Sequence, residues 1–273
     1  MSDLMKQLNE TNSYIRSQIN TDAKVGIILG SGLGNLTNDI SIEKAIPYED
    51  IPHFPVSTVK GHSGKLLFGE LSGKKVIVMG GRFHFYEGYT PKQVIYAVRV
   101  MKLLGIETLL LSNAAGAVNQ HYKVGDLMII TDHISFFTAN PLIGKNEEDL
   151  GTRFPDMSEP YNKGLIAKAQ KIAKTNNIQL HEGIYTAVTG PTFETRAEYK
   201  LIQLIGSDVV GMSTVQETIA AVHCGMKVFG ISVITDIGIR EDENIITHEE
   251  VLQAAKEAEP KLALLFKELV KVI

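Results

Sequence analysis

Short apolar runs alternate along the chain with longer amphipathic stretches. Several runs, such as Val25–Leu29, are apolar at consecutive positions, which is typical of strands buried on both faces of a sheet. The pattern predicts strands at Val25–Leu29, Leu66–Leu71, Val76–Met79, Thr108–Ser112, Leu127–Thr131, Ile184–Val188 and Val228–Ile234. Because helical stretches lie between them, we expect an α/β fold: a single domain, residues 1–273, with a central mixed and mostly parallel β-sheet flanked by helices.

Helix signals fit between these strands. The first twenty residues form an amphipathic pattern, and Thr90 and Pro91 begin a helix that Gly105 ends, at Pro91–Leu104. Thr-x-x-Glu capping boxes at Thr195, Thr214 and Thr247 begin three more helices, the last running from Glu249 to about Val270. The stretch Thr138–Met157 shows little periodicity and is expected to be a long ordered loop, a type of segment that is usually functional.

Composition narrows the class of protein. The 273 residues are 44% hydrophobic and 21% charged, which excludes a disordered chain. The formal net charge of −4 offers no basic excess for a phosphate backbone, so nucleic acid is not an expected partner. The lone cysteine, Cys224, suits a reducing cytosol. The N-terminus lacks a secretory signal and no apolar run is long enough to span a membrane, so we expect a cytoplasmic protein without membrane partners.

Gly30–Gly34, with the sequence GSGLG, follows the first strand directly. Glycines let the backbone turn sharply and bring N–H groups close to an anion, and a following helix would add its positive end. The segment is neither a dinucleotide fingerprint, because Asn35 stands where the last glycine is needed, nor a Walker A motif. A tight turn and a phosphate site with the Ser31 hydroxyl both remain open.

The stretch Gly81–Tyr89, with the sequence GRFHFYEGY, follows the strand at Val76–Met79. Arg82, His84 and Tyr86 alternate, so an extended segment would point all three the same way. A guanidinium beside an imidazole suits phosphate or sulfate, and Glu87 could hold Arg82. The alternative is a surface segment with a satisfied salt bridge.

Four further segments place polar or aromatic residues after strands or before helices. Ser112–Asn119 is small enough to leave room for a ligand, and Phe193 with Glu194 could stack on a planar ring and accept its N–H groups. The alternative is a core phenylalanine and a first-turn glutamate favoured by the helix dipole. Val210–Thr214 joins a short strand to a capped helix, and Asp236 ends the last strand.

Metal and hydrolase sites are disfavoured. The eight histidines are scattered, and a single cysteine cannot anchor a structural zinc. The G-x-S-x-G motif of serine hydrolases is absent from the sequence. We therefore expect no metal site.

Ten segments together resemble the purine nucleoside phosphorylases of the trimeric type, in order and with similar spacing over nearly the whole chain. They are residues 30–34, 61–64, 81–89, 112–119, 125–134, 140–144, 153–161, 190–195, 210–217 and 247–252. The resemblance implies that the protein cleaves purine (2′-deoxy)ribonucleosides with phosphate, giving the free base and (2-deoxy)ribose 1-phosphate. It also implies a homotrimer, with inorganic phosphate as co-substrate and no cofactor.

The same resemblance assigns the site residues. Phosphate would lie among Ser31, His62, Arg82, His84, the backbone amide of Ala114, and Ser213. The nucleoside would contact Tyr86, Asn113, Phe193, Glu194, Val210, Met212, Thr235, Asp236 and His248, with Phe154 reaching in from a neighbouring subunit. His84, Glu194, Asp236 and His248 would act in catalysis.

One residue departs from the family pattern in a way that bears on the base. Asp236 stands where the 6-oxopurine enzymes usually carry asparagine, whereas the related methylthioadenosine phosphorylases carry aspartate there but lack the counterpart of Glu194. Inosine and guanosine are expected substrates, and the alternative is a phosphorylase that prefers adenosine. Two different functions compete with phosphorolysis: a nucleoside hydrolase, which would need an aspartate cluster for Ca²⁺, and a non-catalytic purine-binding module.

Overall fold

The computed structural model describes residues 2–31, 33–58, 63–239 and 247–273. Nine strands are present in these residues: β1 (Val25–Ile28), β2 (Ser41–Pro47), β3 (Lys65–Leu71), β4 (Lys74–Met79), β5 (Thr108–Ala117), β6 (Leu127–Ile134), β7 (Leu180–Ala187), β8 (Val209–Gly211) and β9 (Lys227–Ile237). The α-helices are α1 (Asp3–Gln18), α2 (Pro91–Val94), α3 (Tyr96–Leu104), α4 (Lys163–Thr175), α5 (Arg196–Leu204), α6 (Val215–His223) and α7 (His248–Val272). Short 3₁₀ helices are η1 (Gly34–Asp39), η2 (Tyr48–Asp50) and η3 (Phe85–Glu87).

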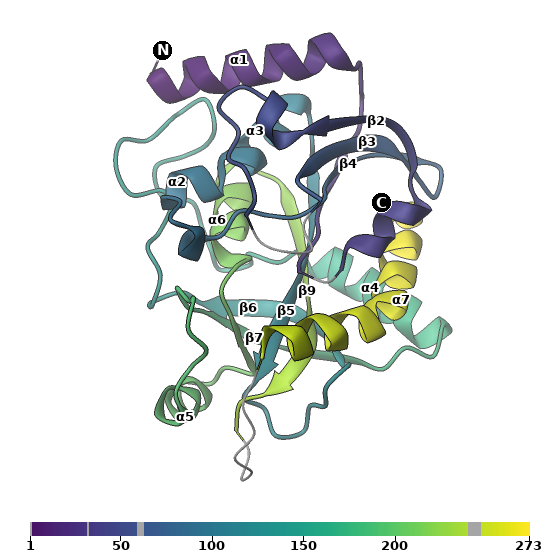
Figure 1. The fold of residues 1–273 in the computed structure, drawn as a ribbon, viewed down its shortest axis with the longest axis vertical. Helices are drawn as coiled ribbons and strands as arrows, with labels where there is room; N and C mark the ends of the chain where they lie inside the picture. The colour runs from purple at the N-terminus through teal and green to yellow at the C-terminus, as the bar shows by residue number, and fades with distance from the viewer. Residues whose placement is uncertain (1, 32, 59–62, 240–246) are drawn as a thin grey trace.

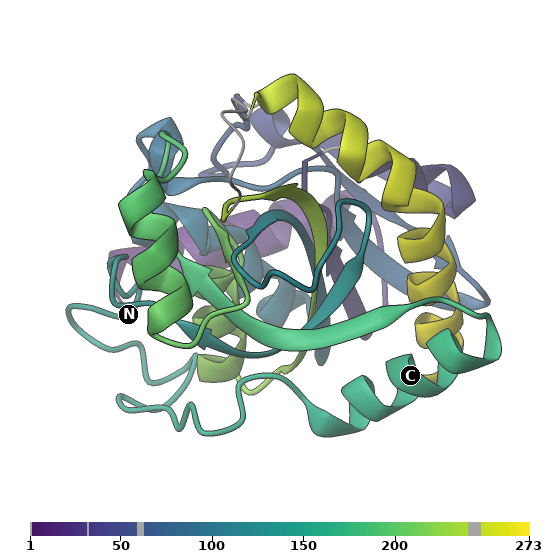
Figure 2. The same cartoon turned by 90° about the horizontal axis from the view of Figure 1, so that it is seen from below.

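The strands form one mixed sheet in the order β2-β3-β4-β1-β5-β8-β7-β6-β9 (Figure 1). At its centre β1 runs parallel to both β4 and β5, which brings their carboxyl ends to the same edge. β9 also pairs with β5, so that β5, β8, β7, β6 and β9 close into a ring whose curved strands are visible in Figure 2. The predicted α/β fold with a mixed sheet is confirmed.

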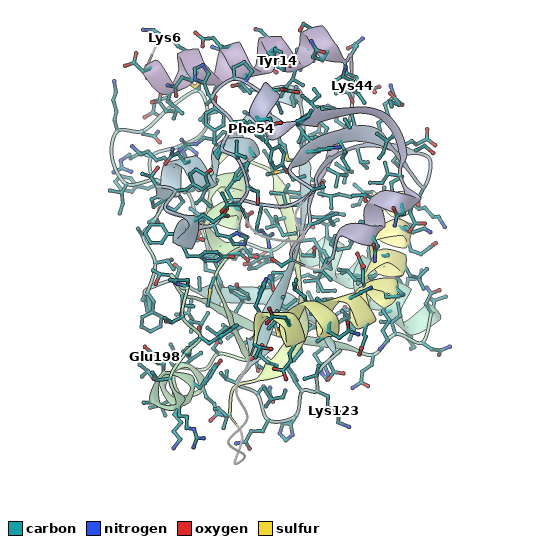
Figure 3. All side chains as sticks on the ribbon, viewed as in Figure 1. Lys6, Tyr14, Lys44, Phe54, Lys123 and Glu198 are labelled. Atoms are coloured by element: carbon teal, nitrogen blue, oxygen red, sulfur yellow. The ribbon has the colours of Figure 1, made fainter. Side chains whose placement is uncertain are left out.

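Helices cover the sheet from different sides. α1 packs on α3 and α3 on α6, while α4 and α7 pack together on the other side near the C-terminus (Figures 1 and 2). α7 bends along its length in Figure 2, and Pro260 within it removes one helical N–H. Apolar side chains fill the space between these layers, while charged ones such as Lys6 and Lys123 lie at the surface (Figure 3). No helix in the described residues is both long and apolar enough to cross a bilayer.

Each strand predicted from an apolar run is present, but the edges of the sheet were harder to predict. The whole of β2 was missed, because it is an exposed strand at the edge of the sheet formed by the described residues and has no continuous apolar run. β5 continues through the small residues Ala114–Ala117, which have little strand preference of their own. Neighbouring strands, rather than local pattern, decide both outcomes.

The helix predictions hold with two corrections. The predicted helix Pro91–Leu104 is capped by Thr90 and Gly105, as expected, but Ile95 interrupts it with ψ near 1° and divides it into α2 and α3. The helix expected after Gly30–Gly34 is only the 3₁₀ helix η1, so this turn carries no α-helical dipole. All three Thr-x-x-Glu capping boxes are formed as predicted. Residues 135–162 contain no helix or strand, which confirms the long loop.

Candidate active site

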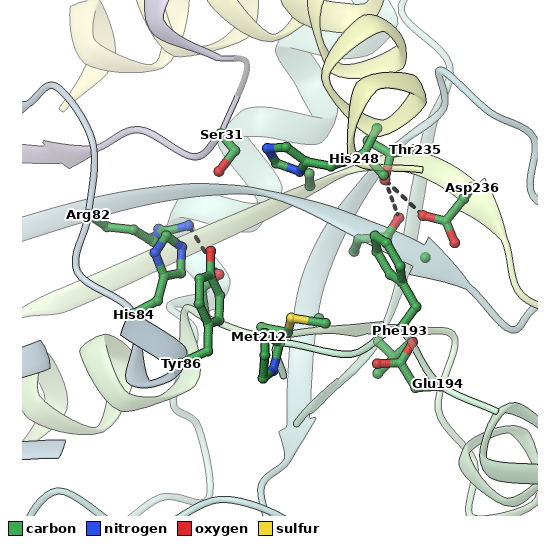
Figure 4. Close-up of a pocket in the computed structure, with 18 of the residues that line it drawn as sticks. Ser31, Arg82, His84, Tyr86, Phe193, Glu194, Met212, Thr235, Asp236 and His248 are labelled. Atoms are coloured by element: carbon green, nitrogen blue, oxygen red, sulfur yellow. Dashed lines mark hydrogen bonds between the residues drawn. The ribbon is translucent and has the colours of Figure 1, made fainter. Parts of the chain in front are cut away.

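A cavity of about 330 Å³ lies at the edge of the sheet where β1, β4, β5 and β9 end (Figure 4). Ligands of α/β proteins are commonly bound at this edge, because the loops that leave parallel strands converge there. The cavity is lined by Ser31, Arg82, His84, Tyr86, Ala114, Ala115, Gly116, Pro191, Phe193, Glu194, Tyr199, Val210, Gly211, Met212, Ser213, Thr235, Asp236, His248 and Val251. Ser31, Arg82 and His84 lie toward one end, while Phe193, Glu194 and Asp236 lie toward the other.

Arg82 provides the positive charge of the first end. Its side chain is only 1% exposed, and its Nε donates to Glu217 Oε1 at 3.0 Å. Nη1 donates to the Ser112 carbonyl at 2.8 Å and to Ser213 Oγ at 3.2 Å. Nη2 is buried and has no hydrogen-bond partner within the described part of the chain. A buried guanidinium with an unused donor in a cavity is suited to an oxyanion.

His84 lies beside Arg82 and is oriented by Glu87. Four hydrogen bonds reach the Glu87 carboxylate, from the backbone N–H and Nδ1 of His84 and from the N–H and hydroxyl of Thr58. Burial raises the pKa of Glu87, but these bonds outweigh it and bring the pKa down to about 2. An ionised Glu87 can only accept, so Nδ1 of His84 carries a proton and Nε2 is turned away from Glu87. Burial lowers the pKa of His84, so its neutral form is favoured.

The Ser213–Thr214 turn is held in a strained conformation. Thr214 has φ of 71°, a region that β-branched residues rarely adopt. Its N–H donates to Glu217 Oε2 at 2.9 Å, and its hydroxyl accepts from Asn113 Nδ2 at 2.9 Å. Glu217 therefore holds both Arg82 and this turn, and thereby fixes the position of the Ser213 hydroxyl relative to the guanidinium.

The second end of the cavity combines an aromatic ring with two carboxyl groups. Phe193 is 40% exposed, so it is not a core residue. Burial raises the pKa of Glu194, a hydrogen bond from Tyr199 opposes this, and the charge of Asp236 adds to the rise. A flat ring beside a carboxyl suits a planar heterocycle with a ring N–H.

Thr235 and Asp236 both line the cavity although they are adjacent in β9. A regular strand would point them to opposite faces, but the pairing of β9 with β5 shifts register between Ala115 and Gly116. The resulting bulge turns both side chains to the same space. The Thr235 hydroxyl donates to Asp236 Oδ1 at 3.0 Å. A Cβ on Gly116 would lie 2.6 Å from Asp236 Oδ2, so a larger residue there would require the carboxyl group to move.

Tyr86, Met212 and His248 lie between the two ends (Figure 4). The Tyr86 ring stacks on His84, with ring centroids 4.6 Å apart. Burial raises the pKa of Tyr86 to about 12, so its phenol stays protonated near neutral pH. A Cβ on Gly190, where φ is 65°, would lie 2.4 Å from Met212 Sδ. Phenol, thioether and imidazole together suit a polar ring such as a sugar.

The structure brings most of the predicted site residues to this cavity, but two of the described ones, Asn113 and Phe154, do not line it. Asn113 is buried behind the wall and bonded to Thr214, so it positions the turn instead of lining the cavity. Phe154 is 82% exposed on the long loop, with the Arg153 guanidinium 5.1 Å from its ring centroid. His62 lies outside the described residues.

The sequence predicted the wrong carboxylate partner for Arg82. Glu87 does not hold Arg82 as expected, because it is bonded to His84, and Glu217 takes that role instead. Glu217 was recognised only as a helix cap. The signal that could have found it is a carboxylate at an inward position of an otherwise buried helix, where a charge needs a partner.

A family model for the phosphorylase superfamily matches residues 24–271 of the chain. The chain is 51% identical over 267 residues to purine nucleoside phosphorylase 1 of Bacillus subtilis, with 98% of this chain and 97% of the relative covered. The chain belongs to the purine nucleoside phosphorylase family. Two solved structures of the phosphorylase from Schistosoma mansoni, in complex with inosine and with adenosine, share this family fold at TM-scores of 0.92 and 0.93. Their identities are 39% and 40%, and each comparison covers 98% of this chain and 97% of the other.

Proposed function

We propose that this protein catalyses the reversible phosphorolysis of purine ribonucleosides and 2′-deoxyribonucleosides, giving the free base and (2-deoxy)ribose 1-phosphate. The observation that carries the proposal is one cavity with an oxyanion end at Arg82, His84 and Ser213 and a heterocycle end at Phe193 and Glu194. A sugar placed between them would present C1′ to both. The family, whose members include purine nucleoside phosphorylases, supports the same reaction.

Phosphate is proposed to be held by Ser31, Arg82, His84, the Ala114 amide and Ser213, with His62 as a further ligand. Hydrogen phosphate carries one O–H, and neutral His84 can accept it at Nε2 because Nδ1 donates to Glu87. Arg82 and the serine hydroxyls then donate to the other oxygens. The phosphate is thereby fixed with one oxygen directed at the sugar.

The bond from C1′ to N9 of the base is proposed to break toward an oxocarbenium-like sugar, as in glycoside hydrolysis. The bonding electrons pass into the purine, which takes up a proton at N7, while a phosphate oxygen forms the new bond to C1′. Overall, the proton that the base gains is the one that hydrogen phosphate loses on becoming the sugar phosphate. The phosphate charge stabilises the cationic sugar before it attacks. The protein supplies position and electrostatics instead of a covalent nucleophile, so no metal or cofactor is required by this chemistry.

Base preference is proposed to depend on Glu194 and Asp236 in opposite ways. Glu194 accepts the N1–H of a 6-oxopurine, whereas adenine has no hydrogen at N1. An ionised Asp236 accepts from a 6-amino group but has no donor for O6 or N7. We therefore expect inosine and guanosine to be substrates, with adenosine accepted better than by a phosphorylase that has asparagine at this position.

Assembly is proposed as a homotrimer in which Phe154 covers the sugar site of a neighbouring subunit. The position of this ring supports the idea, because a side chain that is 82% exposed on a long loop is accessible to a neighbouring subunit. We propose a cytoplasmic location, consistent with the single buried cysteine, Cys224. The whole chain would act as one domain.

Release of base from inosine, measured with and without phosphate, tests the proposed function. We expect release only with phosphate. Release at the same rate in water would indicate a hydrolase, and binding of inosine without release would indicate a non-catalytic module. Ser213→Ala should lower kcat/KM, while Lys123→Gln, at an exposed residue that does not line the cavity, serves as the matched control.

A further inference from the structure

A second cavity of about 300 Å³ shares no lining residue with the active site. It lies between the start of α1, the α2–α3 pair and residues 141–147 of the long loop, which runs beside α2 toward α1 in Figure 1. Its lining residues are Leu4, Gln7, Lys92, Gln93, Tyr96, Arg99, Pro141, Leu142, Lys145, Asn146 and Glu147. The proposed reaction uses none of them.

Arg99 gives this cavity a buried charge that forms no salt bridge within the described residues, although the charge of Glu147 acts on it. The residue is only 4% exposed, and its Nε and Nη1 atoms are buried with no hydrogen-bond partner among the described residues. No carboxylate of the described residues lies within 4.0 Å of the guanidinium. Arginine stays protonated in proteins, and a buried unpaired charge is costly unless something compensates it. The cavity beside Arg99 is therefore suited to an anion.

Two lysines at the rim increase the positive charge. Lys92 and Lys145 are exposed, and neither forms a salt bridge within the part of the chain that the structure describes. The Lys92 ammonium lies 3.0 Å from the point where a Cβ on Gly144 would be, so it reaches from α2 to the loop. The one carboxylate in the lining, Glu147, already accepts from the Ser2 hydroxyl at 2.7 Å.

We propose that this cavity binds a dianionic phosphate group, either free inorganic phosphate or a small phosphate monoester. Three cations face one carboxylate, which leaves about two positive charges, and a phosphate monoester carries nearly two negative charges at pH 7. Arg99 supplies the buried donors, and Lys92 and Lys145 close over the outer oxygens. The bound anion joins α2 and α3 to the loop that carries Phe154.

Equilibrium dialysis with radiolabelled inorganic phosphate tests the proposal. We expect two phosphates per chain for the unaltered protein, one for Arg99→Gln and one for Arg82→Ala. Replacing both Lys92 and Lys145 by glutamine should weaken the Arg99 site at least about tenfold, and these exposed changes keep the test valid if Arg99→Gln does not fold. Lys123→Gln is the matched control and should leave both sites intact.

The outcomes separate this site from the active site. One phosphate per chain that is lost in Arg99→Gln but kept in Arg82→Ala would support this proposal even if the proposed function failed. One phosphate that is lost only in Arg82→Ala, or two that persist in every cavity variant, would overturn it. Unlabelled ribose 5-phosphate should displace the label from the Arg99 site if a monoester is the ligand, and leave it in place if free phosphate is.

Discussion

Asp236→Asn changes one atom of the base end of the cavity and should change its preference between purines. Asp236 is only 9% exposed and lines the same cavity as a second carboxyl group, that of Glu194, whose pKa its charge raises. The carboxylate accepts from Thr235 at 3.0 Å and, when ionised, offers no donor to a 6-oxopurine. Asparagine adds a donor without changing the side-chain size, so the fit against Gly116 is preserved.

The size of the effect follows from the hydrogen bond between residue 236 and the 6-position of the base. The substitution strengthens this bond for inosine and weakens it for adenosine. A neutral hydrogen bond contributes about 0.5–1.5 kcal/mol. Inosine gains such a bond from the amide donor, while adenosine exchanges a charge-assisted acceptor for a neutral amide oxygen, which weakens its bond by about 1 kcal/mol. The two effects add in the ratio of kcat/KM for inosine over adenosine, giving about 1.5–2.5 kcal/mol, or roughly tenfold to seventyfold.

Steady-state phosphorolysis of both nucleosides at saturating phosphate measures this ratio. The expected result is a rise of at least about tenfold in Asp236→Asn. Glu194→Gln is the matched comparison, and it should lower the ratio because the amide is a weaker acceptor for N1–H. A ratio that stays constant or falls in Asp236→Asn would show that Asp236 does not contact the 6-position and that the proposed orientation of the base is wrong.

Three further predictions concern phosphate, assembly and pH. Arg82→Ala should raise the phosphate KM at least about tenfold, with a smaller change in the nucleoside KM, and should also destabilise the fold by about 3–5 kcal/mol because Glu217 loses its buried partner. Adding Glu217→Gln should recover stability in a denaturation experiment but not the KM. Light scattering should give about three times 30.0 kDa, and a fully active monomer would contradict the role of Phe154. The depressed pKa of Glu87 predicts stability that is complete above about pH 4.5 and is lost as pH falls toward 2, and chemical denaturation of Glu87→Gln should show a flatter pH dependence.

The sequence predicts features of this fold that depend on near neighbours. Each capping box needs only residues three positions apart, and Thr195, Thr214 and Thr247 begin helices as expected. Buried strands are likewise visible as apolar runs. The edge strand β2 and the interruption at Ile95 were missed, because pairing and packing with distant segments decide them.

The site shows the same division between local and distant contacts. The types of residue at Arg82, His84 and Phe193 indicate an anion and a planar ring from the sequence alone. The partner of Arg82 lies 135 residues away, and no local pattern distinguishes Glu217 from the nearer Glu87. The bulge that turns Thr235 and Asp236 to one cavity depends on the register of two strands, which the sequence of either strand does not specify.

Phosphorus NMR of a reaction with inosine and inorganic phosphate tests the central claim most directly, because it observes the new bond between phosphate and the sugar. We predict one ribose 1-phosphate for each hypoxanthine released, and consumption of the ester when hypoxanthine is added in excess. Hypoxanthine released with no phosphate ester, or an inorganic phosphate signal unchanged after prolonged incubation, would contradict the account.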